Sequence, residues 1–217
     1  MELRPATSSH HRPRKERSFT LDDITDYYEL VLVDTSAFIA SFERYRENVE
    51  LDFGGQLRKL QKVERSLQGF IDSIREKEII RTTQLVVDEL QRYKVTPLHR
   101  KHDGHIPINR LAQKGERKIR TLTSLIKLVE LSPDERERYD ICKKVYTPHI
   151  GAYRLSETDA DLLFTGIILG LENTQTALLT KDSGISKAHF HLRRIDTSYP
   201  SEFNMFFACK RGEYDLI

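Results

Sequence analysis

Cysteine is scarce in this sequence and long hydrophobic runs are absent, and both facts limit the class of protein. Only two of the 217 residues are cysteine. Cys142 and Cys209 lie far apart in the sequence and match no metal-ligand spacing. The reducing cytoplasm is the simplest location for a protein with this cysteine content. No apolar run approaches the roughly 20 residues that cross a bilayer. The N-terminus has no apolar stretch of the signal-peptide type. We therefore expect a cytoplasmic protein with no membrane segment.

Several catalytic and binding motifs are also missing. There is no internal repeat with a period of 20 to 50 residues. The glycine pair in "DFGG", residues 52–55, lacks the Lys and Ser/Thr that a phosphate-binding loop requires. Cys142 has no obvious histidine base, which speaks against a cysteine nucleophile. His99, His102 and His105 recur every third residue, but a zinc site would want a fourth ligand, usually Cys. Nucleic-acid contact or plain solvation explains these histidines better.

Charge is distributed unevenly along the chain, although the net charge is only +2. Residues 1–18 carry five Lys and Arg against two Glu and read as a mobile basic tail. Residues 92–120 carry nine Lys and Arg against two acids. Basic clusters on an otherwise acidic chain favour a polyanionic partner. A solvated charged face is the alternative.

Hydrophobic patterning indicates alternating strands and helices. Buried strands are expected at 30–33, 78–82, 176–180 and 192–196, and the segment "EFNMFFACK" adds apolar residues near the C-terminus. Helices are expected at 37–48, at 57–74, in "TTQLVVDELQRYK" (residues 82–94), at about 109–130, at 132–147 and from Ser156. Residues 95–108 read as a loop. This order predicts an α/β fold with helices on both faces of a mainly parallel sheet, formed by residues 19–217 and elaborated by a basic loop and helix at about 92–130.

Acidic residues recur where an open α/β sheet binds its ligands. Asp34 ends the run "LVLV", and Asp182 follows the strand "TALLT". The carboxyl ends of parallel strands meet at one edge, where such sheets hold their ligands. A turn or a helix cap is the simpler explanation for a single Asp in either position.

Helix geometry selects two further acids. At 100° per residue, Glu89 falls within the apolar face formed by Leu85, Val86, Leu90 and their neighbours, whereas Asp88 falls opposite. Asp159 shares a strip with Gly166 and Gly170, where backbones approach closely. Ser156 and Asp159 also fit a capping box, which would explain this acid without a site.

Asp161 competes with Asp159 for the third position, although it shares a face with Thr165 and Glu172 that looks solvated. Several carboxylates gathered together repel one another, and hard divalent ions such as Mg²⁺ or Mn²⁺ relieve that repulsion.

Four short motifs in this order resemble the PIN domain family: Asp34 after a strand, "VVDEL" with Glu89, "SETDADLL" with Asp159, and "LLTKDSGIS" with Asp182. The resemblance covers most of residues 29–196. It implies a parallel sheet flanked by helices and a metal-dependent ribonuclease in which these four acids coordinate the metal. It also implies that Thr180 or Ser183 orients the last acid, and Ser36 is a further candidate for a supporting role. A haloacid-dehalogenase-like enzyme would need a second Asp at position 36, where this chain has Ser.

These observations predict an Mg²⁺- or Mn²⁺-dependent endonuclease that hydrolyses single-stranded or structured RNA, with DNA as the other candidate substrate. Phosphate contacts are expected from six cations of the basic segment: Arg100, Lys101, Arg110, Lys114, Arg117 and Lys118. The alternative is a catalytically idle scaffold of the same fold that binds nucleic acid or protein. An inhibiting, antitoxin-like or complex-forming protein partner is compatible with either reading.

Overall fold

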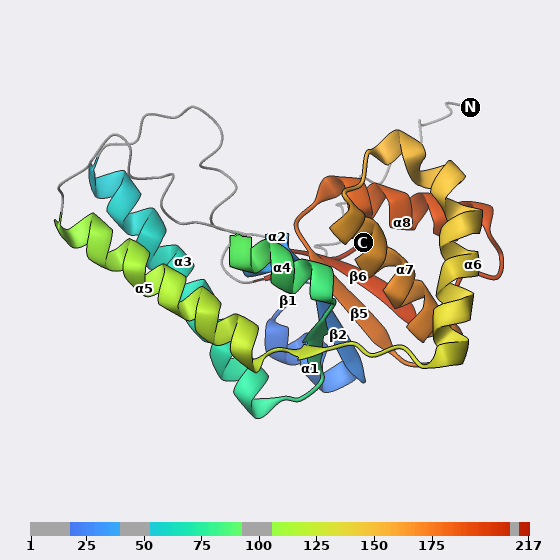
Figure 1. The fold of residues 1–217 in the computed structure, drawn as a ribbon, viewed down its shortest axis with the longest axis horizontal. Coiled ribbons are helices and arrows are strands. Elements are labelled where there is room, and N and C mark those ends of the chain that lie inside the picture. Colours follow the sequence, from blue (N-terminus) through green and yellow to red (C-terminus); the bar gives the residue numbers. More distant parts are fainter. Residues whose placement is uncertain (1–17, 40–52, 93–105, 209–212) are drawn as a thin grey trace, which may run out of the picture.

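The computed structural model describes residues 18–39, 53–92, 106–208 and 213–217 (Figure 1). The predicted basic tail lies almost entirely outside these residues. So do Cys209, the histidines at 99, 102 and 105, and two of the expected phosphate-binding cations, Arg100 and Lys101.

A seven-stranded sheet forms the centre of the described structure. Its order is β1-β7-β6-β5-β2-β3-β4. Neighbouring strands from β6 to β4 pair in parallel, and the pairs β6–β7 and β1–β7 are antiparallel. The α/β class and the mainly parallel sheet are thus confirmed. The strands are β1 (Ser18–Phe19), β2 (Leu30–Val33), β3 (Ile80–Thr82), β4 (Lys127–Leu128), β5 (Thr176–Thr180), β6 (Phe203–Ala208) and β7 (Tyr214–Leu216).

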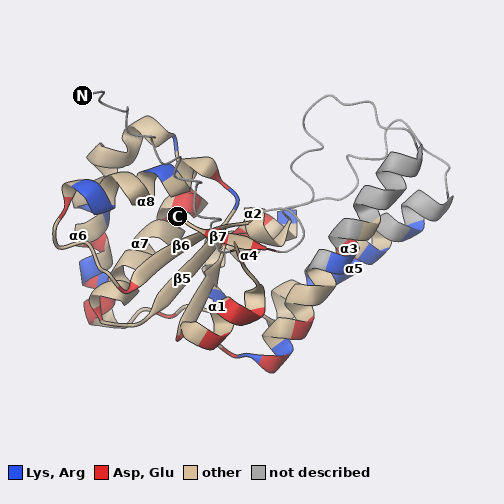
Figure 2. Cartoon of the chain, turned by 180° about the vertical axis from the view of Figure 1, so that it is seen from behind, with Lys and Arg blue, Asp and Glu red and all other residues tan. Residues whose placement is uncertain are grey.

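Helices lie on both sides of this sheet, as the opposite views of Figures 1 and 2 show. The central one is α7, which is buried continuously from Leu162 to Gly170 and packs on β5 and β6. A Cβ on Gly166 would stand 2.3 Å from the Phe203 ring, so only glycine lets α7 approach β6 this closely. The described α-helices are α1 (Leu21–Tyr27), α2 (Thr35–Phe38), α3 (Phe53–Glu76), α4 (Gln84–Arg92), α5 (Ile106–Leu125), α6 (Pro133–Ile150), α7 (Glu157–Leu171) and α8 (Ser183–Ile195), and the short 3-10 helix η3 spans Gly151–Tyr153.

The prediction of a last central strand at 192–196 is wrong. These residues close helix α8, and the next parallel strand is β6. Ile185, Ala188 and Leu192 are buried at helical spacing, while the two arginines before Ile195 occupy the last turn of α8, where cations favour the helix dipole. The predicted helix at 37–48 is described only as the short α2, because residues 40–52 lie outside the described ranges.

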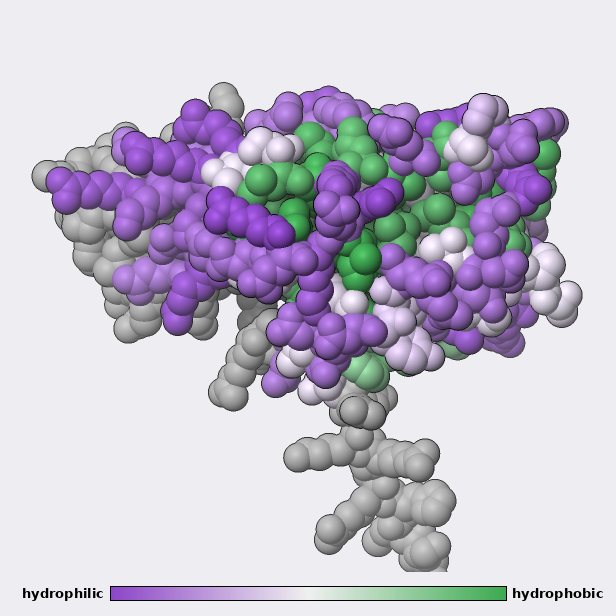
Figure 3. All heavy atoms as spheres, turned by 90° about the horizontal axis from the view of Figure 1, so that it is seen from below, coloured by the Kyte–Doolittle hydropathy of each residue, from purple (hydrophilic) through white to green (hydrophobic). Residues whose placement is uncertain are grey.

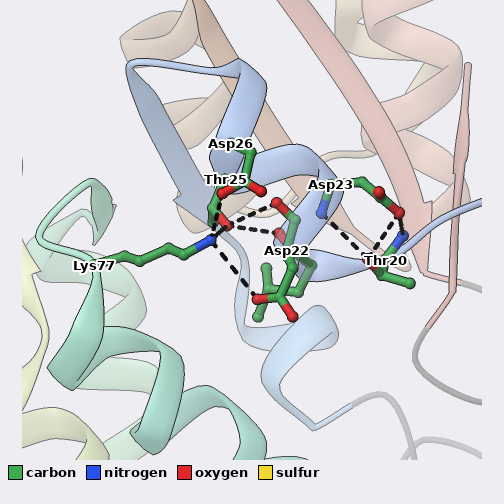
Figure 4. Close-up of polar contacts among 7 residues, drawn as sticks. Thr20, Asp22, Asp23, Thr25, Asp26 and Lys77 are labelled. Atoms are coloured by element: carbon green, nitrogen blue, oxygen red, sulfur yellow. Dashed lines mark hydrogen bonds and ion pairs between the residues drawn. The ribbon is translucent and has the colours of Figure 1, made fainter.

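Helices α3 and α5 lie side by side and project from the sheet as an arm (Figure 1). The prediction of a loop up to residue 108 ends too late, since α5 already begins at Ile106. Lys77, directly after α3, anchors the base of this arm to α1. Its Nζ donates to Thr25 Oγ1 and to Asp26 Oδ1, both at 2.7 Å, and lies 3.7 Å from Asp22 (Figure 4).

On the face seen from below, hydrophilic residues predominate and the hydrophobic residues gather in a band across the middle (Figure 3). No helix in the described ranges combines the length and the apolar character needed to cross a membrane.

Candidate functional site

Asp34 lies at the end of the central strand β2 with only 2% of its surface exposed. Its carboxylate Oδ2 accepts hydrogen bonds from Ser36 Oγ and from Thr180 Oγ1, the latter at 2.8 Å. By position Asp34 is the N-cap of α2, yet its side chain makes no capping hydrogen bond. The simpler explanation of this acid as a helix cap therefore fails, because its carboxylate is held by hydroxyl groups instead.

These two hydroxyls join Asp34 to the loop after β5. Thr180 Oγ1 accepts the Asp182 N–H at 2.9 Å, and Ser36 Oγ accepts the Lys181 N–H at 2.8 Å. The two oxygens lie 3.3 Å apart. These hydrogen bonds fix the segment that follows β2 relative to the segment that follows β5, at the carboxyl edge of the sheet.

Asp182 is the N-cap of helix α8, which is one of the simpler explanations considered for an Asp that follows a strand. Its Oδ1 accepts from the backbone N–H groups of Gly184 at 2.5 Å and Ile185 at 3.2 Å. Thr180 contacts the backbone of Asp182 rather than its carboxylate. Ser183, the other residue expected to orient this acid, is exposed and donates no side-chain hydrogen bond to any described residue.

Glu89 reaches the same edge from α4. Its Oε2 accepts from Thr35 Oγ1 at 2.9 Å, which connects α4 to the turn after Asp34. Glu89 is exposed, although the helical wheel places it within the apolar face of α4. Asp88 accepts instead from Gln84 of its own helix at 2.7 Å.

Asp159 combines a capping role with a place at the edge. Its Oδ2 accepts from Ser156 N at 3.1 Å and from Ser156 Oγ at 2.7 Å, so the capping box is present. Its charge also acts on Asp34 across the site. The competing Asp161 faces α6, where it accepts from the Tyr139 hydroxyl at 2.6 Å. Of the two acids, Asp159 is the one that belongs to this cluster.

The four carboxylates influence one another electrostatically. Burial raises the pKa of Asp34 to about 7; the hydrogen bonds from Ser36 and Thr180 oppose the shift, and the charges of Asp159 and Glu89 add to it. The pKa of Asp159 is also raised, mainly by burial and further by Asp182 and Glu89, against the hydrogen bonds from Ser156. Four segments distant in sequence thus bring mutually repelling acids to one edge, and repulsion of this kind is relieved by a cation.

The donor set of this edge matches Mg²⁺ or Mn²⁺ in chemistry, since it consists of carboxylate and hydroxyl oxygens. Within the described residues, no three His, Cys, Asp or Glu side chains are grouped so that they could hold a metal ion. Metal binding by Asp34, Glu89, Asp159 and Asp182 stays a prediction.

The basic segment lies on the arm. Figure 2 shows Lys and Arg along the α3–α5 pair and acids at its end near α1. Arg110, Lys114 and Arg117 are exposed at helical spacing on one face of α5. Lys118 has an internal partner, because its Nζ lies 3.1 Å from Glu64 Oε1. This ion pair joins α5 to α3, and the assignment of Lys118 as a phosphate contact stays a prediction.

Thr35 is the site residue that sequence reasoning missed. The hydroxyl pair after Asp34 is visible in the sequence, but the partner of Thr35 lies 54 residues away on α4. Comparisons with protein-family models, with curated proteins and with solved structures return no match for this chain.

Proposed function

We propose that this chain is a metal-dependent endonuclease of the PIN-like type, with RNA as its favoured substrate. The observation that carries the proposal is the buried Asp34 carboxylate at the end of the central strand, together with the charges of Asp159 and Glu89 that act on it. The order of the four acid motifs along the sequence, and their location after parallel strands and in flanking helices, supports the same conclusion.

In this proposal Asp34, Glu89, Asp159 and Asp182 hold one or two divalent ions. A bound divalent ion would supply an activated water and would stabilise negative charge on the phosphate undergoing hydrolysis. Ser36 and Thr180 hold the Asp34 carboxylate in place, and Thr35 holds that of Glu89. The exposed cations of α5, on the α3–α5 arm, bind the phosphate backbone of the substrate.

The two neighbouring acids of α4 provide a matched test of this assignment. Glu89→Gln removes a charge from the acid cluster, whereas Asp88→Asn removes a charge from a side chain that, among the described residues, accepts its hydrogen bond from Gln84 of its own helix. With Mg²⁺ or Mn²⁺ and a labelled single-stranded RNA, Glu89→Gln should lower the cleavage rate at least 100-fold, and Asp88→Asn should leave it within about twofold. Equal losses in both variants, or none in either, would contradict the assignment.

The alternative of an idle scaffold makes a different prediction. It requires binding of nucleic acid or protein without hydrolysis under any divalent ion, and equal behaviour of Glu89→Gln and Asp88→Asn in every assay.

A further inference from the structure

The outward face of α8 carries a row of exposed residues that the acid cluster does not use. Its members recur at helical spacing and are Ser183, Lys187, Phe190 and Arg194. The opposite face of the helix, with Ile185, Ala188 and Leu192, is packed into the core. The row begins at the residue after Asp182, so it leads away from the acidic edge along α8.

Phe190 is the unusual member of this row, because 62% of its surface is exposed. Single exposed apolar residues are common on protein surfaces. Here, however, a cation stands three residues before the ring and another four residues after it. Neither Lys187 nor Arg194 forms an ion pair with any described residue.

A further cation stands beside the start of α8. Arg154 is exposed and has a left-handed backbone, with φ 52° and ψ 43°. Its neighbour Tyr153 packs against the first turn of α8, since the Tyr153 carbonyl oxygen would lie 3.2 Å from a Cβ on Gly184. The Tyr153 ring also lies 5.7 Å from that of His191. A left-handed conformation costs a non-glycine residue on the order of 1 kcal/mol, and such strain is concentrated at functional sites.

We propose that this surface, consisting of Arg154, Lys187, Phe190 and Arg194, binds a single-stranded nucleic acid beside the acidic edge. Cations contact the phosphates, and Phe190 stacks on a base, which is how proteins hold single strands with little sequence preference. A duplex does not offer an unstacked base to such a ring. The inference rests on the proposed nucleic-acid substrate and adds that this substrate is single-stranded near the site.

Fluorescence anisotropy with labelled single-stranded RNA in EDTA tests the surface without cleavage. Phe190→Ala should weaken binding about tenfold or more, because base stacking on an aromatic side chain contributes that much. Phe190→Trp should retain the affinity. Ile141→Ala on α6 is the matched control, since Ile141 is also an exposed apolar residue, at 56%. A strand lacking bases should bind wild type and Phe190→Ala equally.

Charge removal provides a second measurement on the same probe. Lys187→Gln and Arg194→Gln should each reduce the slope of log affinity against log salt by about 0.7. Unchanged affinity of Phe190→Ala for the single strand would overturn the proposal, and so would tighter binding to a duplex of the same length. A change in self-association of Phe190→Ala, measured by sedimentation, would assign the surface to contact between copies and would also overturn it.

These results are separable from the proposed activity. Phe190-dependent binding without metal-dependent cleavage supports the surface and contradicts the nuclease. Cleavage with normal binding by Phe190→Ala supports the nuclease and contradicts the surface.

Discussion

At the scale of single residues, Asp34 is a buried acid whose ionisation opposes folding. Its pKa is about 7 in the folded chain against an ordinary value of 3.8, so the charged carboxylate is better stabilised in the unfolded state. This contribution to stability is full at low pH and is lost as pH rises from about 4 through 7. Acid clusters that bind metal behave in this way when no cation is present.

Asp34→Asn should therefore stabilise the metal-free protein at pH 8, by roughly 1–4 kcal/mol, because it removes the buried charge and keeps a similar shape. The gain should shrink at pH 5, where Asp34 is protonated. Thermal unfolding in EDTA at both pH values measures the difference. A variant that is less stable than wild type at pH 8 would mean that the carboxylate is a structural cap or anchor.

His189 gives the opposite dependence on pH. It is buried, its Nδ1 pairs with the Tyr199 hydroxyl at 2.7 Å, and its Nε2 has no partner among the described residues. Burial lowers its pKa to about 4, with a smaller contribution from Arg193. Protonation thus favours the unfolded chain, and stability is lost as pH falls from about 6.5 towards 4.

Replacing His189 by Gln, which cannot be protonated, should flatten this dependence. Between pH 6.5 and 5 the free energy of unfolding of the wild type should fall faster than that of the variant, by up to about 1.4 kcal/mol per pH unit. Denaturant titrations across this range provide the comparison. Parallel curves would show that His189 does not titrate on unfolding.

At the scale of elements, the arm formed by α3 and α5 carries two kinds of cation: exposed ones that we propose bind phosphate, and one that forms an ion pair within the arm. Arg110, Lys114 and Arg117 lie on the exposed face of α5, whereas Lys118 pairs with Glu64 of α3. Neutralising the first three to Gln should lower RNA affinity and reduce the salt slope by about 2. Lys118→Gln should cost up to about 1 kcal/mol of stability and leave the slope unchanged. Titrations at several salt concentrations decide between the two roles; an unchanged slope in the triple variant would assign the arm to another partner.

Elements also show where sequence patterns succeed and where they mislead. "LVLV" and "TALLT" are short apolar runs bounded by polar residues, and both are buried strands, β2 and β5. "LRRID" has the length of a strand, but its only buried residue continues the helical spacing of Ile185 and Ala188. Over residues 183–195 the buried residues recur at helical spacing, whereas the five residues 192–196 alone are too few to show that period.

At the scale of the whole molecule, the order of strands decides which acids meet. Asp34 and Asp182 can be predicted from the sequence because each follows a buried strand, and parallel pairing of β2 with β5 brings those ends together. Contacts from Thr35 to Glu89 and from Lys118 to Glu64 span 54 residues each, and no local pattern encodes them. A helical wheel places Glu89 on the apolar face of α4, but it does not show that this side chain is exposed in the folded chain.

Cleavage and binding by Asp34→Asn, measured side by side on one single-stranded RNA, test the central claim most directly. The wild type should cut this RNA with Mg²⁺ or Mn²⁺ and stop in EDTA. The variant should lose cleavage, keep RNA affinity within a few-fold, and lose the stabilisation that the metal gives the wild type. A wild type that cuts no RNA or DNA with any divalent ion, combined with unchanged metal-induced stabilisation in Asp34→Asn, would contradict the account.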